Sequence, residues 1–455
     1  MTTGAGQDKA AVIAERPRVL AIAYACHPTE SAESRVGWAR ALMASQRHDV
    51  TVMCHSDLDA DELQRLAVED GADPSIRFQN VPHCVIGMSC RSHDLLYCVG
   101  YRMWHRRVAK LAAELHAARP FDVVHQVNFC GFREPGYGWR VGAPFVWGPL
   151  GGTQNFPLRF LSVLDPYNAV REAGRNVVNW LQLRFSPRLR RVARRSACVM
   201  SATRLAQRDL ERSWGLDTAV ELEAGLSYPP APLRSKRDPS RPLRILWTGR
   251  LRAWKGLPLL LHALAKTPPN VRCEVRVLGE GAGQAGLVRL AKRLGVDDRI
   301  EWVGWGPYPD TLPHYRWADV FAFTSLRDTS GAGLLEALAA GLPIVGIDHQ
   351  GAADIMSDEC AVRLPPSNPR EVIAGFSDAI TRLAGDGELL LRLSHGATRR
   401  ADDFAWDARG AVLDRVYQSA MAPAADRRRA AGTSRPAEPV TRPSLNLQPL
   451  EAVGE

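Results

Sequence analysis

Short apolar, β-branched runs alternate with longer segments of helical period along the whole chain, and both halves show the alternation. Such a pattern predicts parallel strands connected by helices. In the first half we expect strands at 18–25, 50–54, 122–125, 144–147 and 198–201. In the second half we expect them at 243–247, 273–278, 300–303, 320–324 and 343–347. The sequence therefore predicts an α/β protein with two doubly wound, Rossmann-like sheets, whose ligands bind beyond the carboxyl ends of the strands.

The domain boundaries follow from length and composition. At 455 residues the chain is longer than one hydrophobic core usually organises. Five prolines in the segment 227–242 exclude a continuous helix or a central strand, so we interpret it as an interdomain linker. We expect a disordered extension at 1–16, domains at 17–226 and 243–396, a C-terminal helix at 397–421 that returns to the first domain, and a disordered tail at 422–455.

Charge and composition narrow the class of partner. A net charge of +9 favours an anionic partner, which leaves nucleic acid, a membrane surface or a phosphorylated small molecule. No basic stripe interleaved with aromatic residues is present, so we do not expect nucleic acid. No apolar stretch reaches 18 residues, and residues 1–16 lack an apolar signal core. The nine cysteines form no Cys-x-x-Cys pair. We therefore expect a cytoplasmic protein without a structural metal site.

Two loops suit a phosphorylated ligand. The segment 248–256 follows a strand and opens a helix, where unpaired amides favour an anion, and Arg250 and Lys255 add two cations that can neutralise a diphosphate without a metal. An isolated Arg-x4-Lys pair is more often a solvated loop, but this position favours binding. Gly279 and Gly281 follow the next strand and allow close approach of a base or ribose. A tight turn explains these glycines equally well.

The most specific run is 325–343, which contains Asp328 and, eight residues later, Glu336. We expect a helix that begins near Ser330 as its N-cap, with Leu334 and Leu338 facing the core and Glu336 facing a cleft or solvent. One carboxylate would then lie near a sugar and the other near a ribose. Taken alone, such a pair is more often an N-terminal acid and a surface glutamate.

Together, residues 246–256, Gly279 to Gly281 and the acid-x7-Glu run ending in Ala-Ala-Gly-Leu-Pro resemble the GT-B retaining glycosyltransferases of family 4. The likeness extends from about Arg18 to Tyr417. It implies an N-terminal acceptor domain and a C-terminal donor domain, in which Asp328 contacts the donor hexose as a catalytic group. The family usually has Glu at that position. The donor-binding residues that the resemblance implies are Arg250, Lys255, Gly279, Gly281, Gly331, Ala332, Gly333, Leu334, Leu335 and Glu336.

In the first half, residues 32–38 and 125–152 resemble a subset of this family that is linked to cell-surface polysaccharides. The resemblance makes His125 a second candidate catalytic residue. Val127 stands where many members carry another histidine. A lone histidine at a strand end is more often structural.

The resemblance implies transfer of a hexose from a nucleotide diphosphate sugar to a glycan or lipid-linked acceptor, with retention of anomeric configuration and with neither cofactor nor metal. The departing phosphate would take the acceptor's proton. Alternatives are a nucleotide-sugar epimerase, a phosphorylase, for which no Schiff-base lysine is evident, and a non-catalytic nucleotide-sugar-binding or scaffold protein.

One basic segment stands outside this assignment. Arg184 to Arg195 contains six arginines and no acid, and it follows the apolar residues Val177, Val178, Trp180 and Leu181. Such a segment can rest on anionic lipid, which would place the protein peripherally on the inner face of the membrane. A solvated basic face is the alternative of about equal weight.

Overall fold

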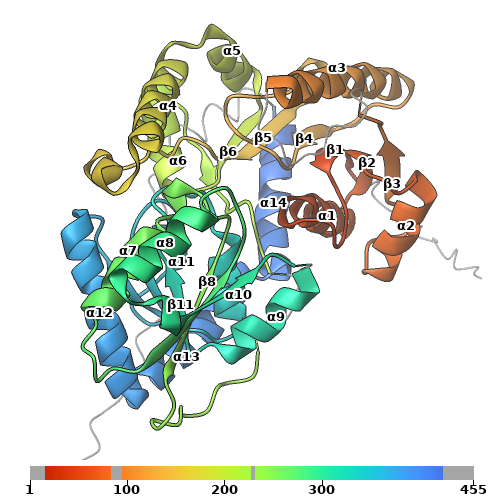
Figure 1. Ribbon diagram of the computed structural model, residues 1–455. Coiled ribbons are helices and arrows are strands. Elements are labelled where there is room, and N and C mark those ends of the chain that lie inside the picture. The colour runs from red at the N-terminus through yellow and green to blue at the C-terminus, as the bar shows by residue number, and fades with distance from the viewer. Residues whose placement is uncertain (1–15, 84–94, 227–230, 307, 424–455) are drawn as a thin grey trace, which may run out of the picture. The chain divides into compact units, whose positions relative to one another are not determined.

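The computed structural model describes residues 16–83, 95–226, 231–306 and 308–423 of the chain (Figure 1). It contains two parallel sheets that belong to one compact unit ending at Met421. The predicted α/β fold with two Rossmann-like sheets is confirmed. The predicted disordered extension and tail lie almost wholly outside the described residues.

The first sheet has seven strands in the order β3-β2-β1-β4-β5-β6-β7. These strands are β1 (Arg18–Ala25), β2 (Asp49–His55), β3 (Arg77–Asn80), β4 (Val123–Gln126), β5 (Phe145–Leu150), β6 (Cys198–Ser201) and β7 (Ala219–Val220). The helices between them are α1 (Ala32–Ser45), α2 (Ala60–Glu69), α3 (Leu95–Ala118), α4 (Pro166–Phe185), α5 (Pro187–Arg195) and α6 (Arg204–Trp214), with short 3-10 turns η1 (Gly138–Arg140) and η2 (Leu158–Val163).

The second sheet has six strands in the order β10-β9-β8-β11-β12-β13. Its strands are β8 (Leu243–Thr248), β9 (Cys273–Leu278), β10 (Ile300–Gly304), β11 (Val320–Phe323), β12 (Ile344–Ile347) and β13 (Ala361–Leu364). Its helices are α7 (Leu257–Lys266), α8 (Gln284–Leu294), α9 (Tyr308–Trp317), α10 (Ala332–Ala339), α11 (Gly351–Ile355), α12 (Pro369–Gly385) and α13 (Gly387–Ala401), with 3-10 turns η3 (Ala253–Lys255) and η4 (Asp297–Arg299).

All ten predicted strands exist, but the sequence missed β3, β7 and β13. Each of the three lies at an edge of its sheet. An edge strand is covered less completely than a central one, and these three are two to four residues long and each contains exposed or half-buried positions. They therefore lack the continuous apolar signal by which the central strands were recognised.

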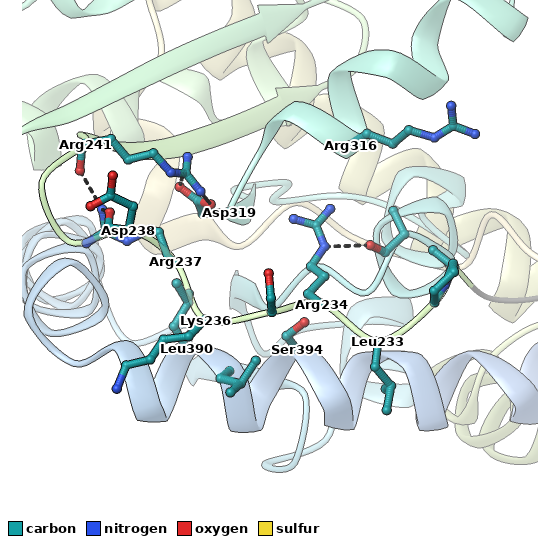
Figure 2. A pocket seen from close by; sticks show the side chains of 15 residues that line it. Leu233, Arg234, Lys236, Arg237, Asp238, Arg241, Arg316, Asp319, Leu390 and Ser394 are labelled. Atoms are coloured by element: carbon teal, nitrogen blue, oxygen red, sulfur yellow. Dashed lines mark hydrogen bonds and ion pairs between the residues drawn. The ribbon is translucent and has the colours of Figure 1, made fainter.

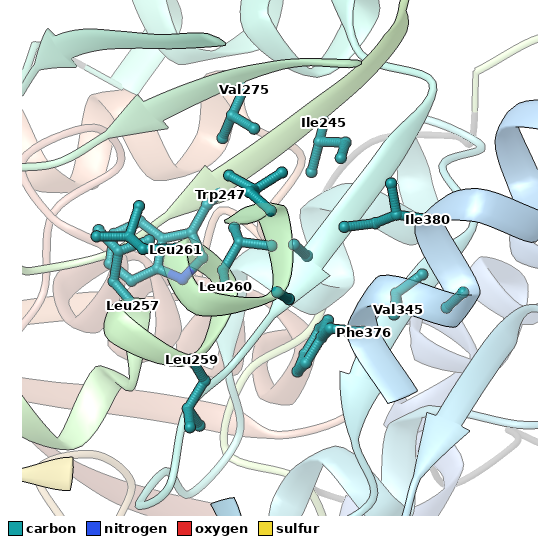
Figure 3. Close-up of a cluster of buried hydrophobic side chains, with 14 of the residues drawn as sticks. Ile245, Trp247, Leu257, Leu259, Leu260, Leu261, Val275, Val345, Phe376 and Ile380 are labelled. Carbon is teal, nitrogen blue, oxygen red and sulfur yellow. The ribbon is translucent and has the colours of Figure 1, made fainter. Parts of the chain in front are cut away.

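The hydrophobic core of the second domain fixes the ends of the loop between β8 and α7. The run Leu257 to Leu261 at the start of α7 buries four leucines against β8 and α12. Figure 3 shows these side chains with Trp247 and Phe376, which are both buried. Because α7 and β8 are fixed by the same core, the loop between them has a defined path at the carboxyl end of β8.

The chain passes between the two sheets twice. Residues 231–242 form no helix or strand, and after α13 the chain continues through η5 (Asp402–Phe404) into α14 (Trp406–Met421). Leu413, Val416 and Tyr417 of α14 belong to the core cluster of β1 and β2, and Figure 1 shows α14 beside α1. The boundary expected at 396/397 falls inside α13, so the helix that packs on the first sheet starts later, at Trp406.

Candidate functional site

The loop after β8 is clamped onto the end of β11. Gly256 has a left-handed backbone with φ 67°, and a Cβ there would lie 2.2 Å from the carbonyl oxygen of Thr324. The Thr324 hydroxyl donates to the Lys255 carbonyl oxygen at 2.7 Å and accepts from the Trp247 indole at 2.9 Å. Only glycine allows this approach without strain, so the loop carrying Lys255 sits on the switch point between β8 and β11.

The loop after β9 packs against the same loop. The Leu251 amide donates to the Glu280 carbonyl oxygen at 2.8 Å. A Cβ at Gly279 would lie 1.9 Å from the Gly249 carbonyl oxygen, and Gly281 has φ 157°. The two predicted donor-binding glycines therefore have a packing reason to be glycine, and they place the end of β9 beside the loop of Arg250 and Lys255.

Lys255 and Asp328 form an ion pair between the loops after β8 and β11. Their Nζ and Oδ2 atoms are 2.5 Å apart, and the side chains are 22% and 21% exposed. The structure thus joins the cation expected at the diphosphate to the carboxylate expected at the hexose. Arg250 is exposed, and its side chain makes no hydrogen bond or ion pair with another described residue.

Helix α10 begins at Ala332, four residues after Asp328. Its N-cap is Gly331, with φ 54° and ψ 68°, and not the predicted Ser330. The left-handed turn favours glycine, and the Ser330 hydroxyl instead donates to Oε1 of Glu223 at 3.2 Å. A Cβ at Gly333 would lie 2.7 Å from Oγ1 of Thr248. The first turn of α10, with its unpaired amides, therefore lies against the end of β8.

Glu336 lies on α10 away from the buried Leu334 and Leu338, as predicted. Its Oε2 accepts a hydrogen bond from the Tyr315 hydroxyl at 2.6 Å, and Arg35 Nη2 is 3.9 Å from its Oε1. Burial raises the pKa of Glu336. The sequence marks Arg35 only as part of the segment 32–38 and does not mark Tyr315. Neither could be placed beside Glu336 from the sequence, because they come from α1 and α9.

Residues of the first domain hold the loop around Asp328. Glu172 of α4 accepts hydrogen bonds from the Arg327 guanidinium at 3.0 and 3.3 Å. The Gln350 side chain accepts from the Asp328 amide at 2.9 Å and donates to the Asn155 carbonyl oxygen at 2.7 Å. The backbone next to the ion pair is therefore fixed by partners from both halves of the chain.

Glu223 is a further carboxyl group at this place that the sequence analysis missed. Burial raises the pKa of Glu223 to about 7, and the nearby carboxylates of Glu33 and Asp328 act in the same direction. The Ser330 hydroxyl and the Arg40 guanidinium oppose the shift. The residue follows β7 in the loop before the linker, where no motif marks it.

His125 does not join these residues. It is fully buried, with Nδ1 2.8 Å from the Tyr417 hydroxyl and Nε2 2.8 Å from the Gly148 carbonyl oxygen. Burial lowers the pKa of His125 to about 3. Both ring nitrogens are engaged inside the protein, so we correct its candidate catalytic role to a structural one.

The cavity of about 630 Å³ in Figure 2 lies elsewhere. Residues of the 231–241 segment line it together with Asp319, which precedes β11 at the amino end of that strand. Arg241 pairs with Asp319 at 2.7 Å, and Arg234 donates to the Ala340 carbonyl oxygen at 3.0 Å. This cavity is therefore separate from the loops at the carboxyl ends of the strands. Among the described residues, no group of three or more His, Cys, Asp or Glu side chains is placed to hold a metal ion.

Residues 233–400 match a protein family described as "Glycosyl transferases group 1". This stretch contains β8 to β13 and all the candidate donor residues. Two curated relatives are named D-inositol 3-phosphate glycosyltransferase. The one from Corynebacterium efficiens is 29% identical over 41% of this chain and 46% of its own length, and the one from Streptomyces bingchenggensis is 31% identical over 47% and 46%. The chain thus spans about half the length of these curated relatives.

Solved structures share the two-sheet fold. HepE of Anabaena in complex with UDP has a TM-score of 0.57 at 16% identity, covering 88% of this chain and 100% of its own. Sucrose-phosphate synthase of Thermosynechococcus elongatus has a TM-score of 0.62 at 16% identity, covering 89% and 98%. The comparisons confirm the GT-B fold, and residues 233–400 are similar to group 1 glycosyltransferases.

The raised pKa of Glu223 predicts a pH-dependent effect on stability. The carboxyl group keeps its proton up to about pH 7 in the folded state but loses it near 4.5 when unfolded, so its stabilising contribution is complete below pH 4.5 and is lost as the pH rises to about 7. Glu223→Gln should therefore have a higher unfolding temperature than the wild type at pH 8, and its free energy of unfolding should be larger by at most about 3 kcal/mol. This gain in stability should disappear at pH 4.5.

Thermal denaturation at both pH values measures the effect, with the exposed Glu114→Gln on α3 as the control. Equal gains at pH 4.5 and pH 8 would contradict a proton held by Glu223.

Proposed function

We propose that the protein is a retaining hexosyltransferase that uses a nucleoside diphosphate sugar as donor. The observation that carries the proposal is the Lys255–Asp328 pair, whose acid lies four residues before α10, together with Glu336 in the second turn of that helix. The match of residues 233–400 to group 1 glycosyltransferases supports it. So do the names of neighbours with the same fold, which include HepE complexes with UDP and with UDP-glucose.

In the proposed donor complex, the diphosphate takes the place of Asp328 as the partner of Lys255. The amides of Gly331 to Leu335 face the phosphates and the sugar, because an anion at a helix N-terminus is stabilised by unpaired N–H groups. Arg250 is free to turn onto the phosphates from the loop edge. Asp328, once released, accepts hydrogen bonds from hexose hydroxyls.

Glu336 is the proposed ribose ligand. Its carboxylate already accepts a hydrogen bond from Tyr315, which orients it from the α9 side. Carboxylate oxygens accept from the paired hydroxyls of a ribose. Gly279 and Gly281 let the loop after β9 pack against the loop of Arg250 and Lys255, and this packing places the end of β9 beside the proposed donor site.

The chemistry requires stabilisation of the negative charge that develops on the leaving diphosphate. Lys255, Arg250 and the amides of α10 supply it from fixed positions, so that the reaction proceeds without a metal. The C1–O bond to the diphosphate breaks, the acceptor oxygen bonds to C1 on the same face, and the departing phosphate takes the acceptor's proton. Configuration at C1 is thereby retained.

The proposed acceptor is a glycan or a lipid-linked sugar used in cell-surface polysaccharide biosynthesis. Support comes from the resemblance of residues 32–38 and 125–152 to glycosyltransferases of that kind. The curated relatives suggest D-inositol 3-phosphate as an additional probe. A nucleotide-sugar-binding protein without transferase activity is the other outcome that a turnover assay can return.

We also propose that the protein rests on an anionic membrane through α4 and α5. Seven large apolar side chains of α4 are exposed, with fractions from 44% to 74%: Tyr167, Val170, Val177, Val178, Trp180, Leu181 and Phe185. Most are spaced three or four residues apart, so they share one side of the helix. An exposed apolar surface of this size is unusual on a monomer and marks an interaction site.

Helix α5 adds the charge. Its apolar residues Leu189, Val192 and Ala193 are buried, which turns Arg190, Arg191, Arg194 and Arg195 outward. Figure 1 shows α5 directly following α4 at one end of the first domain. The apolar side chains can insert at the acyl boundary of a membrane, and the clustered arginines beside them can bind its anionic headgroups. Among the described residues, no helix combines the length and apolar character that a membrane span requires.

Removal of either proposed phosphate cation should weaken nucleotide binding. Lys255→Ala and Arg250→Ala should each raise the Kd for UDP by roughly 10-fold or more, because a hydrogen bond to a charged group contributes about 1.5–3 kcal/mol. Calorimetric titration measures the effect after a thermal-shift screen of UDP, GDP and ADP. Arg252→Ala, an exposed arginine of the same loop, should change Kd less than twofold. An equal loss of UDP affinity in all three variants would contradict direct phosphate contacts and would indicate that only the net positive charge of the loop matters.

Turnover tests the reaction itself. Purified protein should release UDP from UDP-hexoses when supplied with a lipid-linked sugar extract or D-inositol 3-phosphate, and the rate should persist in saturating EDTA. The anomeric proton coupling of the product, measured by NMR, should match that of the donor. Inverted product, or activity that EDTA abolishes and a divalent metal restores, would contradict the mechanism. Donor binding without turnover on any acceptor would indicate a binding protein.

Flotation tests the membrane surface. The wild type should float with vesicles of phosphatidylglycerol and phosphatidylcholine at moderate salt, and Trp180→Glu/Phe185→Glu should stay unbound. Replacing Arg190, Arg191 and Arg194 by Gln should weaken binding by roughly 100-fold, since each cation near an anionic surface contributes about 1 kcal/mol. Val68→Glu on α2, 40% exposed in the wild type, should bind normally. A wild type that does not float would end the proposal.

A further inference from the structure

Glu223 is held in place by its backbone. The Leu222 carbonyl oxygen accepts a hydrogen bond from Arg40 Nη2 at 2.8 Å and another from Arg409, and the Glu223 carbonyl oxygen lies 3.4 Å from the same Arg40 nitrogen. Arg40 and Arg409 are both buried and come from α1 and α14. A segment fixed by two buried guanidinium groups presents its side chain in one direction, so the placement of the Glu223 carboxyl group is built into the fold.

The carboxyl group lies between two loops of the site. Its Oε1 accepts the Ser330 hydroxyl at 3.2 Å, one residue before the N-cap of α10. Its Oε2 lies 3.5 Å from the position that a Cβ on Gly151 would occupy, and accepts no hydrogen bond from a described residue. Thr329 approaches the same Gly151 position to 2.8 Å. Glu223 therefore faces the Asp328–Ser330 loop from the first domain.

The Glu223 carboxyl group has no role in the transfer reaction proposed above. Asp328, two residues before Ser330, is the proposed ligand of the donor hexose, so a hexose held by Asp328 lies at the loop that Glu223 faces. The Glu33 and Asp328 carboxylates are close enough to raise the pKa of Glu223, which shows that acidic groups gather here. Among the described residues, Asp328 is the one of these three acids that pairs with a lysine, Lys255.

We propose that Glu223 is a specificity-determining residue of the donor site, which accepts a hydrogen bond from a hydroxyl of a neutral donor hexose and rejects donors that carry a carboxylate on the sugar. This inference rests on the proposed donor function and deepens it. A carboxylate is an acceptor-only group and suits sugar hydroxyls, whereas a uronic acid would bring another negative charge against Glu33, Glu223 and Asp328.

The test compares nucleotides that differ only in the sugar. At pH 8, where Glu223 is ionised, the wild type should bind UDP-glucose, UDP-galactose or UDP-N-acetylglucosamine more tightly than UDP, and UDP-glucuronate at least 10-fold more weakly than the best of them. Glu223→Gln should raise the Kd for that hexose donor by roughly 10-fold, change the Kd for UDP less than twofold, and narrow the discrimination against UDP-glucuronate. Gln has nearly the same size and can still accept from Ser330.

Ser330→Ala tests whether Glu223 recognises the sugar or only links its own segment to the Asp328–Ser330 loop. The variant removes the hydrogen bond to Oε1 of Glu223 and leaves the carboxylate in place. Its effect on hexose-donor affinity should be smaller than that of Glu223→Gln. Equal effects of both variants, an equal loss of UDP and UDP-hexose affinity, or an unchanged preference in Glu223→Gln would each overturn the inference. The proposed function fails separately, if the wild type binds no nucleoside diphosphate, and the inference then falls with it.

Discussion

The ion pair between Lys255 and Asp328 is the contact on which the account of the site depends. It joins the loop after β8 to the loop after β11, the two strands at which the order of the second sheet reverses. Parallel sheets bind ligands at this reversal because the loops there diverge to opposite faces of the sheet. The pair holds a cation and an acid half-buried next to each other. In the proposed donor complex, a diphosphate replaces Asp328 at Lys255, and Asp328 becomes available to a sugar.

The first domain also positions the loop that carries Asp328. Glu172 of α4 holds Arg327, and Asn155 holds Gln350, so the backbone of Asp328 is positioned by both halves of the chain. On its outer side α4 carries the apolar residues of the proposed membrane surface. The same helix therefore contacts the loop of Arg327 and Asp328 with one side and exposes apolar side chains on the other. Arg40 and Arg409 fix the segment before the linker in a similar way.

Much of this arrangement could be predicted from the sequence because it is local. The central strands are continuous apolar runs, and Lys255, Asp328 and Glu336 lie in loops and a helix whose residue types already suggest phosphate and sugar binding. The edge strands β3, β7 and β13 were missed because edge positions need no continuous apolar pattern. The residue type of Ser330 predicts an N-cap there, but Gly331 is the N-cap because it adopts the left-handed turn before the helix.

What the sequence could not provide are contacts made over long separations. Glu223 meets Ser330 across more than one hundred residues, and Arg35 approaches Glu336 across three hundred. No local pattern encodes such pairs, because they exist only once both sheets have formed. At His125 the sequence predicts a role that the structure does not support. Its position in a motif indicates a catalytic residue, but its ring is buried, with its two nitrogens hydrogen-bonded to the Tyr417 hydroxyl and the Gly148 carbonyl oxygen.

A crystal structure of the protein with a bound UDP-hexose would show whether Lys255 and Asp328 separate to receive the donor. We expect Lys255 Nζ to leave Asp328 and contact a phosphate oxygen at the first turn of α10, while Glu336 contacts the ribose. A nucleotide bound away from the carboxyl ends of β8 and β11, or a Lys255–Asp328 pair that persists beside a bound diphosphate, would contradict this expectation.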